Sequence, residues 1–179
     1  RVMEHSKSAA RRLAIIDRLA DHVLAHGLDA ASLRALAKAA GTSDRMLLYY
    51  FSDKSEIVAA ILGRIAERMT VALAQRTAPQ PLPLDALIQH LSAIVLEDEF
   101  WPYMCVWLEL ASRAGRSDPD FAPIAAQIGH GFLAWGAMQL SASDEQARAR
   151  DAARLLVMIE GLVMVKAIGL SNVVEQVAG

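Results

Sequence analysis

The sequence predicts an all-α protein made of two helical parts. Apolar residues recur at spacings of three and four along most of the 179 residues, and no segment alternates with period two over the length that a strand needs. Just over half of the residues are apolar, which is enough for a well-packed core. Three of the six prolines fall in residues 77–83, so we expect the boundary between the two parts there.

The first helix is expected over residues 7–26, because Leu13, Ile16 and Ala20 share one side and Gly27 can end it. Ser32 then suits the N-cap of a second, short helix. The buried stripe of that helix has the spacing i, i+3, i+4, i+7 and consists of Leu33, Leu36, Ala37 and Ala40.

Gly41 marks the turn into a third helix, since glycine tolerates the positive φ with which helices often end. Thr42 or Ser43 can cap this third helix. Its inward face is expected to consist of Asp44, Leu47, Leu48 and Phe51. By elimination, the outward face consists of Arg45, Met46, Tyr49 and Tyr50. Two short helices at a tight turn, with phenol and guanidinium groups facing outward, are typical of a helix-turn-helix that docks in the major groove of DNA.

The outward side chains suggest how DNA is held. Arg45 is the expected base reader, because a guanidinium can bridge O6 and N7 of guanine. Lys54, at the start of the next helix, is expected to hold a phosphate together with the free N–H groups of that helix. The residues expected to contact DNA are Ser32, Arg34, Thr42, Ser43, Arg45, Met46, Tyr49, Tyr50 and Lys54.

A fourth helix begins with the capping box of Asp53 and Glu56 and is expected to reach about residue 76. We therefore expect a DNA-binding domain in residues 1–53, a connecting helix in 54–76 and a second domain in 77–179.

Further helices are predicted at residues 84–97, 100–114, 119–139 and 144–168. Asp118 before Pro119 favours the start of the third of these, and Ser143 with Gln146 favours the start of the fourth. Residues 172–179 are too few to assign.

Charge is distributed unevenly between the two parts. Residues 1–76 hold 12 Lys+Arg against 8 Asp+Glu, whereas residues 77–179 hold 6 against 12. This asymmetry favours a nucleic-acid-facing module on an acidic body. Cys105 is the only cysteine, which excludes an intrachain disulfide and suits the cytoplasm, and neither a signal peptide nor a membrane span is expected.

The helix-turn-helix region also carries a sequence motif. Its residues are Gly27-Leu28, Ser32-Leu33-Arg34, Leu36-Ala37, Ala40-Gly41-Thr42-Ser43, Leu47-Leu48-Tyr49-Tyr50-Phe51 and Asp53-Lys54-Ser55-Glu56-Ile57. In this order they resemble the TetR family of bacterial transcriptional repressors. Three residues depart from the family pattern: Leu48 replaces a common Tyr, Ala31 a Thr, and Asp44 a neutral or basic residue. The resemblance implies a helical second domain that binds an effector and forms a dimer, with double-stranded operator DNA as the partner.

In the second part, the helix around Trp101 is apolar on all sides, so it must be buried or line a cavity. The residues expected to line an effector pocket are Trp101, Met104, Cys105, Leu108, Phe132 and Trp135. The same aromatic stripe would also fit an ordinary packed core. Within this apolar region the polar candidates are His90, Glu109, His130 and Glu160, and Arg113 lies four residues after Glu109, as in a helical salt bridge.

A homodimer is expected through the helices near 119–139 and 144–168, where glycines permit close helix crossings. The expected interface residues are Gly129, Gly136, Leu155, Ile159, Leu162 and Lys166.

No nucleophile elbow, phosphate loop, dinucleotide fingerprint or metal-ligand spacing occurs, so we expect no enzyme activity, no cofactor and no metal. The leading interpretation is a repressor released from its operator by a small, largely apolar effector. The alternative is a DNA-bound dimeric adaptor without a small-molecule pocket, regulated by a protein partner. A void of about 300 Å³ or more in the second domain would favour the effector.

Overall fold

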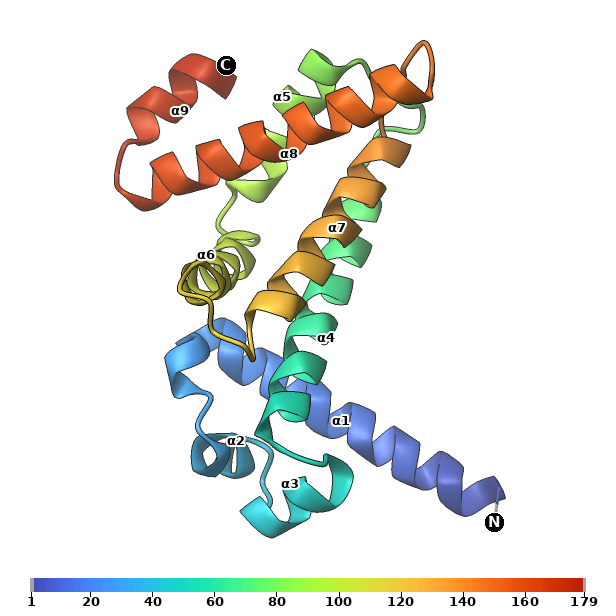
Figure 1. Cartoon of the computed structure of the whole chain (residues 1–179), viewed down its shortest axis with the longest axis vertical. Coiled ribbons are helices and arrows are strands. Elements are labelled where there is room, and N and C mark those ends of the chain that lie inside the picture. Colours follow the sequence, from blue (N-terminus) through green and yellow to red (C-terminus); the bar gives the residue numbers. More distant parts are fainter. Residues whose placement is uncertain (1, 179) are drawn as a thin grey trace.

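The computed structural model describes residues 2–178, and within this range the chain is all-helical (Figure 1). Its elements are α1 (Val2–His26), the 3-10 helix η1 (Leu28–Ala30), α2 (Leu33–Ala39), α3 (Asp44–Tyr50), α4 (Lys54–Ala74), α5 (Leu84–Val95), α6 (Trp101–Gly115), α7 (Ala122–Met138), α8 (Glu145–Ala167) and α9 (Ser171–Ala178). The predicted all-α class and the N-terminal helix-turn-helix are therefore confirmed.

The helices form an elongated molecule with the helix-turn-helix at one end (Figure 1). Helices α1, α2 and α3 gather at that end, and α4 runs from them alongside α7. Helix α8 packs across α5 and α7, and α9 folds back beside α8. Helix α6 contacts α1, η1, α7 and α8, so it joins the two ends of the molecule.

A buried cluster and several ion pairs fix α1 against α4. Leu19 and Val23 from α1 are fully buried together with Ile57 and Ile61 from α4. At the edge of this interface Asp17 accepts hydrogen bonds from Arg64 Nε (2.7 Å) and Arg68 Nη2 (2.8 Å). These hydrogen bonds from Arg64 and Arg68 lower the pKa of Asp17.

Several helix starts differ from those predicted. Helix α1 already begins at Val2. Helix α7 begins at Ala122 rather than residue 119, because the Asp118 carboxylate accepts from the Asp120 N–H at 3.0 Å and forms a turn there. Helix α8 is capped by Asp144 rather than Ser143, because the Asp144 carboxylate accepts from the Ala147 N–H at 2.7 Å.

The unassigned C-terminal residues form α9, and η1 was not predicted from the sequence. The residues of η1 lie between α1 and α2 and, as shown below, touch α6.

Candidate functional site

The turn between α2 and α3 has the geometry of a tight helix-turn-helix. Ser32 caps α2 and Ser43 caps α3, each hydroxyl accepting a backbone N–H at 3.2 Å. After α2 the N–H groups of Gly41 and Thr42 donate back to the carbonyls of Lys38 (3.1 Å) and Ala37 (3.0 Å). This bonding pattern requires a residue with positive φ, and Gly41 has φ +67°. The predicted cap and turn residues therefore act together to set the angle between the two helices.

Two arginines on α1 hold the ends of these helices. Arg18 Nη1 donates to the carbonyl of Ala40, the C-cap of α2, at 3.3 Å. Arg12 forms an ion pair with Glu56 at 3.0 Å, and its guanidinium lies 4.5 Å from the centre of the buried Phe51 ring at the end of α3. Hence α3 is braced from behind, which leaves its outer face free to meet a ligand.

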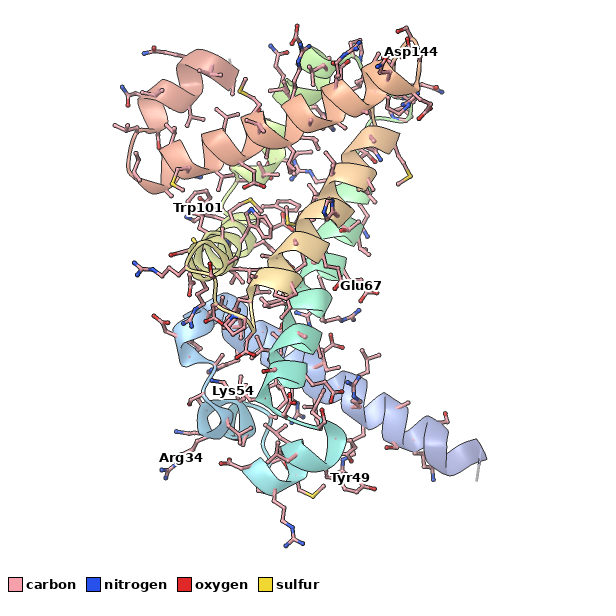
Figure 2. All side chains as sticks on the ribbon, viewed as in Figure 1. Arg34, Tyr49, Lys54, Glu67, Trp101 and Asp144 are labelled. Carbon is pink, nitrogen blue, oxygen red and sulfur yellow. The ribbon has the colours of Figure 1, made fainter. Side chains whose placement is uncertain are left out.

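The outer face of α3 is exposed. Arg45 and Met46 are exposed, and Tyr49 has 76% of its surface accessible. Tyr50 is only half-buried, because it packs against the core and stacks edge-on against Tyr49. The remaining residues expected at the DNA lie around this face: Ser32, Arg34, Ser43 and Lys54 are exposed and Thr42 is half-buried. Figure 2 shows Arg34 and Tyr49 at the end of the molecule formed by α2 and α3.

Leu48 was predicted to face inward, and this was wrong. It is 46% exposed, whereas Leu47 is fully buried and Phe51 is 2% exposed. Helix α3 is only seven residues long, and its buried line runs through Leu47, Phe51 and the half-buried Tyr50, which leaves Leu48 to one side. The exposed Leu48 therefore joins Arg45, Met46 and Tyr49 on the outer surface, where sequence periodicity alone did not place it.

A polar contact joins this end of the molecule to α6. Glu109 Oε2 accepts a hydrogen bond from the Leu28 N–H at 2.8 Å, and Arg113 Nη2 donates to Asp29 at 2.5 Å. Gly27 precedes this contact with φ +81° and ψ 176°. The predicted salt bridge between Glu109 and Arg113 is therefore absent, because both side chains bind η1 instead.

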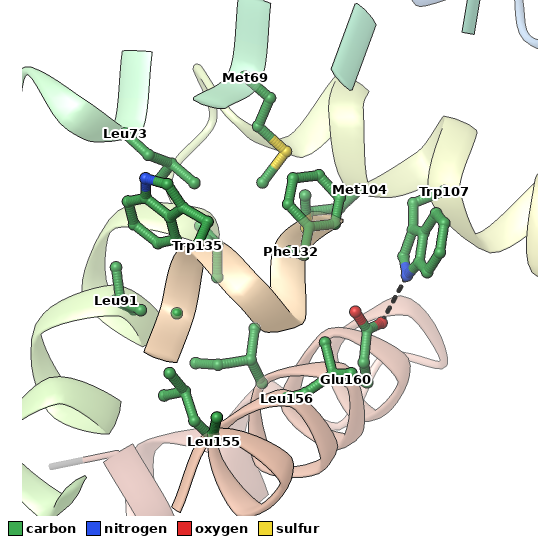
Figure 3. A pocket seen from close by; sticks show the side chains of 14 residues that line it. Met69, Leu73, Leu91, Met104, Trp107, Phe132, Trp135, Leu155, Leu156 and Glu160 are labelled. Carbon is green, nitrogen blue, oxygen red and sulfur yellow. Dashed lines mark hydrogen bonds between the residues drawn. The ribbon is translucent and has the colours of Figure 1, made fainter. Parts of the chain in front are cut away.

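A small apolar cavity lies in the other half of the molecule, among α4, α5, α6, α7 and α8 (Figure 3). Its volume is about 70 Å³, and its lining consists of Met69, Leu73, Leu91, Val95, Met104, Trp107, Phe132, Trp135, Gly136, Ala152, Leu155, Leu156, Ile159 and Glu160. This cavity alone is smaller than the roughly 300 Å³ expected of an effector site, whereas an open groove among α5, α8 and α9 has a volume of about 680 Å³. The lining side chains surround the cavity and leave only a small open volume in this conformation.

Three of the six predicted pocket residues, Met104, Phe132 and Trp135, line this cavity. Trp101, Cys105 and Leu108 do not. Trp101 instead lies beneath Lys166, whose Nζ is 4.4 Å from the ring centre. Burial raises the pKa of the Cys105 thiol. Sequence periodicity predicted correctly that α6 borders the cavity, but it did not predict which side chains of α6 face it.

Glu160 is the one ionisable residue of the cavity lining. Its Oε2 accepts a hydrogen bond from Trp107 Nε1 at 2.7 Å, drawn as a dashed line in Figure 3. Burial raises the pKa of this carboxyl group, and the Trp107 hydrogen bond opposes that shift. The sequence had marked Glu160 only as one of four polar candidates. Of the others, His90 binds the Arg76 carbonyl at 2.7 Å, and His130 is exposed.

The residues predicted for a dimer interface lie mostly inside the chain. Gly136, Leu155 and Ile159 line the cavity, and Leu162 is 5% exposed. Lys166 Nζ donates to the Leu96 carbonyl, and Gly129 lies close to Trp107. The apolar side chains that α8 exposes are others, namely Val157, Met158 and Met164, and Ile168 is exposed at its C-cap.

The side chains of residues 6–178 include no group of three or more His, Cys, Asp or Glu placed to hold a metal ion. Across the same range, every helix is too short or too polar to cross a membrane.

Comparisons with known proteins agree with the fold. The pattern of "Bacterial regulatory proteins, tetR family" matches residues 15–61, which hold the helix-turn-helix. The chain is 24% identical over 96 residues to the HTH-type transcriptional repressor AcnR of Corynebacterium efficiens, an alignment that covers 54% of this chain and 46% of that protein. The chain thus spans about half the length of this relative.

Solved structures of similar fold cover nearly the whole chain. A transcriptional regulator from Rhodococcus sp. Rha1 has a TM-score of 0.70 at 23% identity and covers 93% of this chain and 91% of its own. Salmonella enterica GusR has a TM-score of 0.62 at 18% identity, covering 86% and 82%. A structure from Saccharomonospora viridis, described as a regulator in complex with choline, has a TM-score of 0.59 at 17% identity and covers 94% of each chain.

The fold and the braced outer face of α3 define a helix-turn-helix protein. Residues 15–61 within this N-terminal domain match the tetR family of bacterial regulatory proteins, and the solved structures named above share the fold of the chain.

Proposed function

We propose that the protein is a homodimeric, sequence-specific DNA-binding repressor of transcription that a small effector releases from its operator. The observation that carries the proposal is the outer face of α3, where Arg45, Leu48 and Tyr49 are exposed while Arg12 and Arg18 fix the helix ends. A rigid helix with exposed side chains can enter the major groove without a large loss of conformational entropy.

Within this proposal each exposed group has a distinct role. Arg45 reads guanine, and Leu48 offers an apolar contact to a thymine methyl group. Lys54 and Tyr49 hold phosphates, which position the helix without reading sequence. Asp44 lies on the exposed first turn of α3 and repels phosphate, which lowers affinity for all DNA alike.

The test is operator selection from random DNA, followed by binding measurements over a range of salt concentrations. Arg45→Ala should cost about 1–3 kcal/mol and relax one operator position, whereas Lys54→Ala should weaken all sequences alike and reduce the salt slope by about one. Arg150→Ala, at an exposed position on α8, is the matched control. Unchanged specificity in Arg45→Ala would refute its role as the base reader.

For the dimer we propose the outer faces of α7 and α8, which lie over α4 and α5 in Figure 1. Val157 is 72% and Met138 68% exposed, and Met164 lies on the same outer layer, so a second copy could cover this apolar surface. Gly161 is exposed with free space around it, so Gly161→Arg should yield folded monomers that bind DNA weakly. Sedimentation of an unchanged dimer would contradict this placement.

For the effector we propose the cavity at Glu160. A carboxyl group in an apolar wall supports a binding role, and the choline complex of the S. viridis protein supports a small organic ligand in this fold. The adaptor alternative is favoured by the small volume, about 70 Å³. Met104→Trp distinguishes them, because the larger ring would fill the cavity: it should abolish induction and leave DNA binding intact. A protein-regulated adaptor would be unaffected.

A further inference from the structure

We propose that the effector is a small organic cation whose ammonium head is bound by Glu160 and the aromatic rings beside it. This inference rests on the proposed function and names the ligand class of the same site. Its basis is the charge of Glu160, the geometry of its carboxylate and rings, and the size of the cavity.

The cavity contains a single charge and no partner for it. All other lining residues are apolar, and among the described side chains no Lys, Arg or His forms an ion pair with Glu160. The nearest lysine along α8, Lys166, donates to the Leu96 carbonyl and covers Trp101. Glu160 is half-buried, and a carboxylate partly removed from water without a countercharge is destabilising, so a cationic ligand gains more here than in solvent.

The carboxylate is oriented for a ligand. Trp107 Nε1 donates a hydrogen bond to Oε2 (Figure 3), and the described side chains of residues 6–178 give Oε1 no hydrogen-bond partner. None of these side chains has a polar atom that is both fully buried and unpaired, so Oε1 must border accessible space. The free oxygen is therefore available to accept from, or pair with, a group that enters the cavity.

Aromatic rings complete a site for a cation. Trp107 and Phe132 pack edge to face at 6.1 Å between ring centres, and Trp135 lines the same cavity. The faces of such rings attract ammonium groups, most strongly when the groups are desolvated. An anion would meet both the carboxylate and the negative ring faces, so the site discriminates against it.

Size limits the head group, and a neighbouring groove can take a tail. The cavity of about 70 Å³ suits a head no larger than a methylated ammonium. Phe132 and Trp135 also line a second space of about 310 Å³ between α4 and α7. These two side chains form the partition between the spaces, so their rotation would let a ligand extend from Glu160 into the groove.

Three probes of one shape and different charge test the inference. They are trimethyl(3-hydroxypropyl)ammonium, its neutral carbon isostere 4,4-dimethylpentan-1-ol, and the anion 4,4-dimethylpentanoate. Binding to the full chain is measured by calorimetry and by tryptophan fluorescence. The variant is Glu160→Gln, which keeps an acceptor for Trp107, and Glu175→Gln at an exposed position on α9 is the control. Circular dichroism verifies that both variants fold.

The ammonium probe should bind at least about tenfold more tightly than the alcohol, the anion should not bind, and Glu160→Gln alone should abolish the preference. Equal binding of alcohol and ammonium, a preference that survives Glu160→Gln, or no binding of the ammonium probe at about 10 mM would overturn the inference. DNA binding is measured separately from ammonium binding. If the protein binds an operator but not the ammonium probe, only the cation site is overturned. Ammonium binding without operator binding overturns the repressor and supports the site.

Discussion

Replacing Gly27 with Ala tests the contact between α6 and the DNA-binding end. Gly27 has φ +81° and ψ 176°, a region that only glycine occupies without strain, and an alanine there costs about 1–3 kcal/mol. The added Cβ would also lie 2.8 Å from Glu109 Oε1, which forces the carboxylate away from the Leu28 N–H. An ionic hydrogen bond of this kind contributes about 1.5–3 kcal/mol. Together the two effects predict a loss of about 2.5–6 kcal/mol.

Thermal and chemical unfolding at a fixed protomer concentration measure this loss, which corresponds to roughly 10 °C in Tm for a chain of this size. Gly63→Ala is the control, because its Cβ meets nothing within 4 Å in the middle of α4, and it should stabilise by about 0.5–1 kcal/mol. The double variant Gly27→Ala/Glu109→Ala removes the collision, so its loss should be smaller than the sum of the two single losses. A Gly27→Ala protein as stable as the wild type would refute the reasoning.

Three further predictions concern single charges. Burial raises the pKa of Glu160 above its unfolded value, so the ionised carboxylate destabilises the fold. Glu160→Gln should therefore be more stable than the wild type at pH 8, and the difference in stability should vanish as the pH falls toward about 4. Arg64 and Arg68 lower the pKa of Asp17, so Asp17→Asn should lose about 1 kcal/mol of unfolding free energy at neutral pH after solvent screening, and this deficit should disappear below about pH 4. Unfolding curves at several pH values test the Glu160 and Asp17 variants. A stability difference that does not change with pH would contradict the prediction for that variant. Asp44→Asn should bind all DNA sequences about two- to tenfold more tightly than the wild type at low salt, and the difference should decrease at high salt. Fluorescence anisotropy titrations measure both affinities. Equal affinity of variant and wild type would show that Asp44 lies away from the phosphates.

Sequence reasoning succeeded where a short stretch of chain determines its own structure. The caps Ser32 and Ser43 and the turn at Gly41 depend on local hydrogen bonds, so residue type and spacing were sufficient to predict them. The same reasoning failed for Leu48, because a helix of seven residues has too few positions to fix its buried direction. That direction is set by α1, through Arg12 and the packing of Phe51.

Longer-range features were only partly accessible. The sequence indicated an apolar helix near Trp101, but the rotation of α6 decides that Met104 and Trp107 face the cavity and Trp101 does not. The partners of Glu109 and Glu160 lie 81 and 53 residues away along the chain, so no local pattern could reveal them. Periodicity instead suggested an i,i+4 pair for Glu109, a contact that contributes only a few tenths of a kcal/mol and is easily replaced by a backbone N–H.

Under the proposed function, these contacts would let α6 couple the cavity to the helix-turn-helix end of the molecule. Trp107 on α6 borders the cavity and binds Glu160, and Glu109, two residues along the same helix, binds the Leu28 N–H in η1. A helix transmits displacement along its axis because its backbone hydrogen bonds resist local deformation. A cation that draws Glu160 away from Trp107 would therefore act on the helix that also anchors η1. Such a ligand would shift the DNA-bound population only if it bound two arrangements of α6 with different affinity, and the Trp107–Glu160 hydrogen bond is a contact that a cation at Glu160 would change.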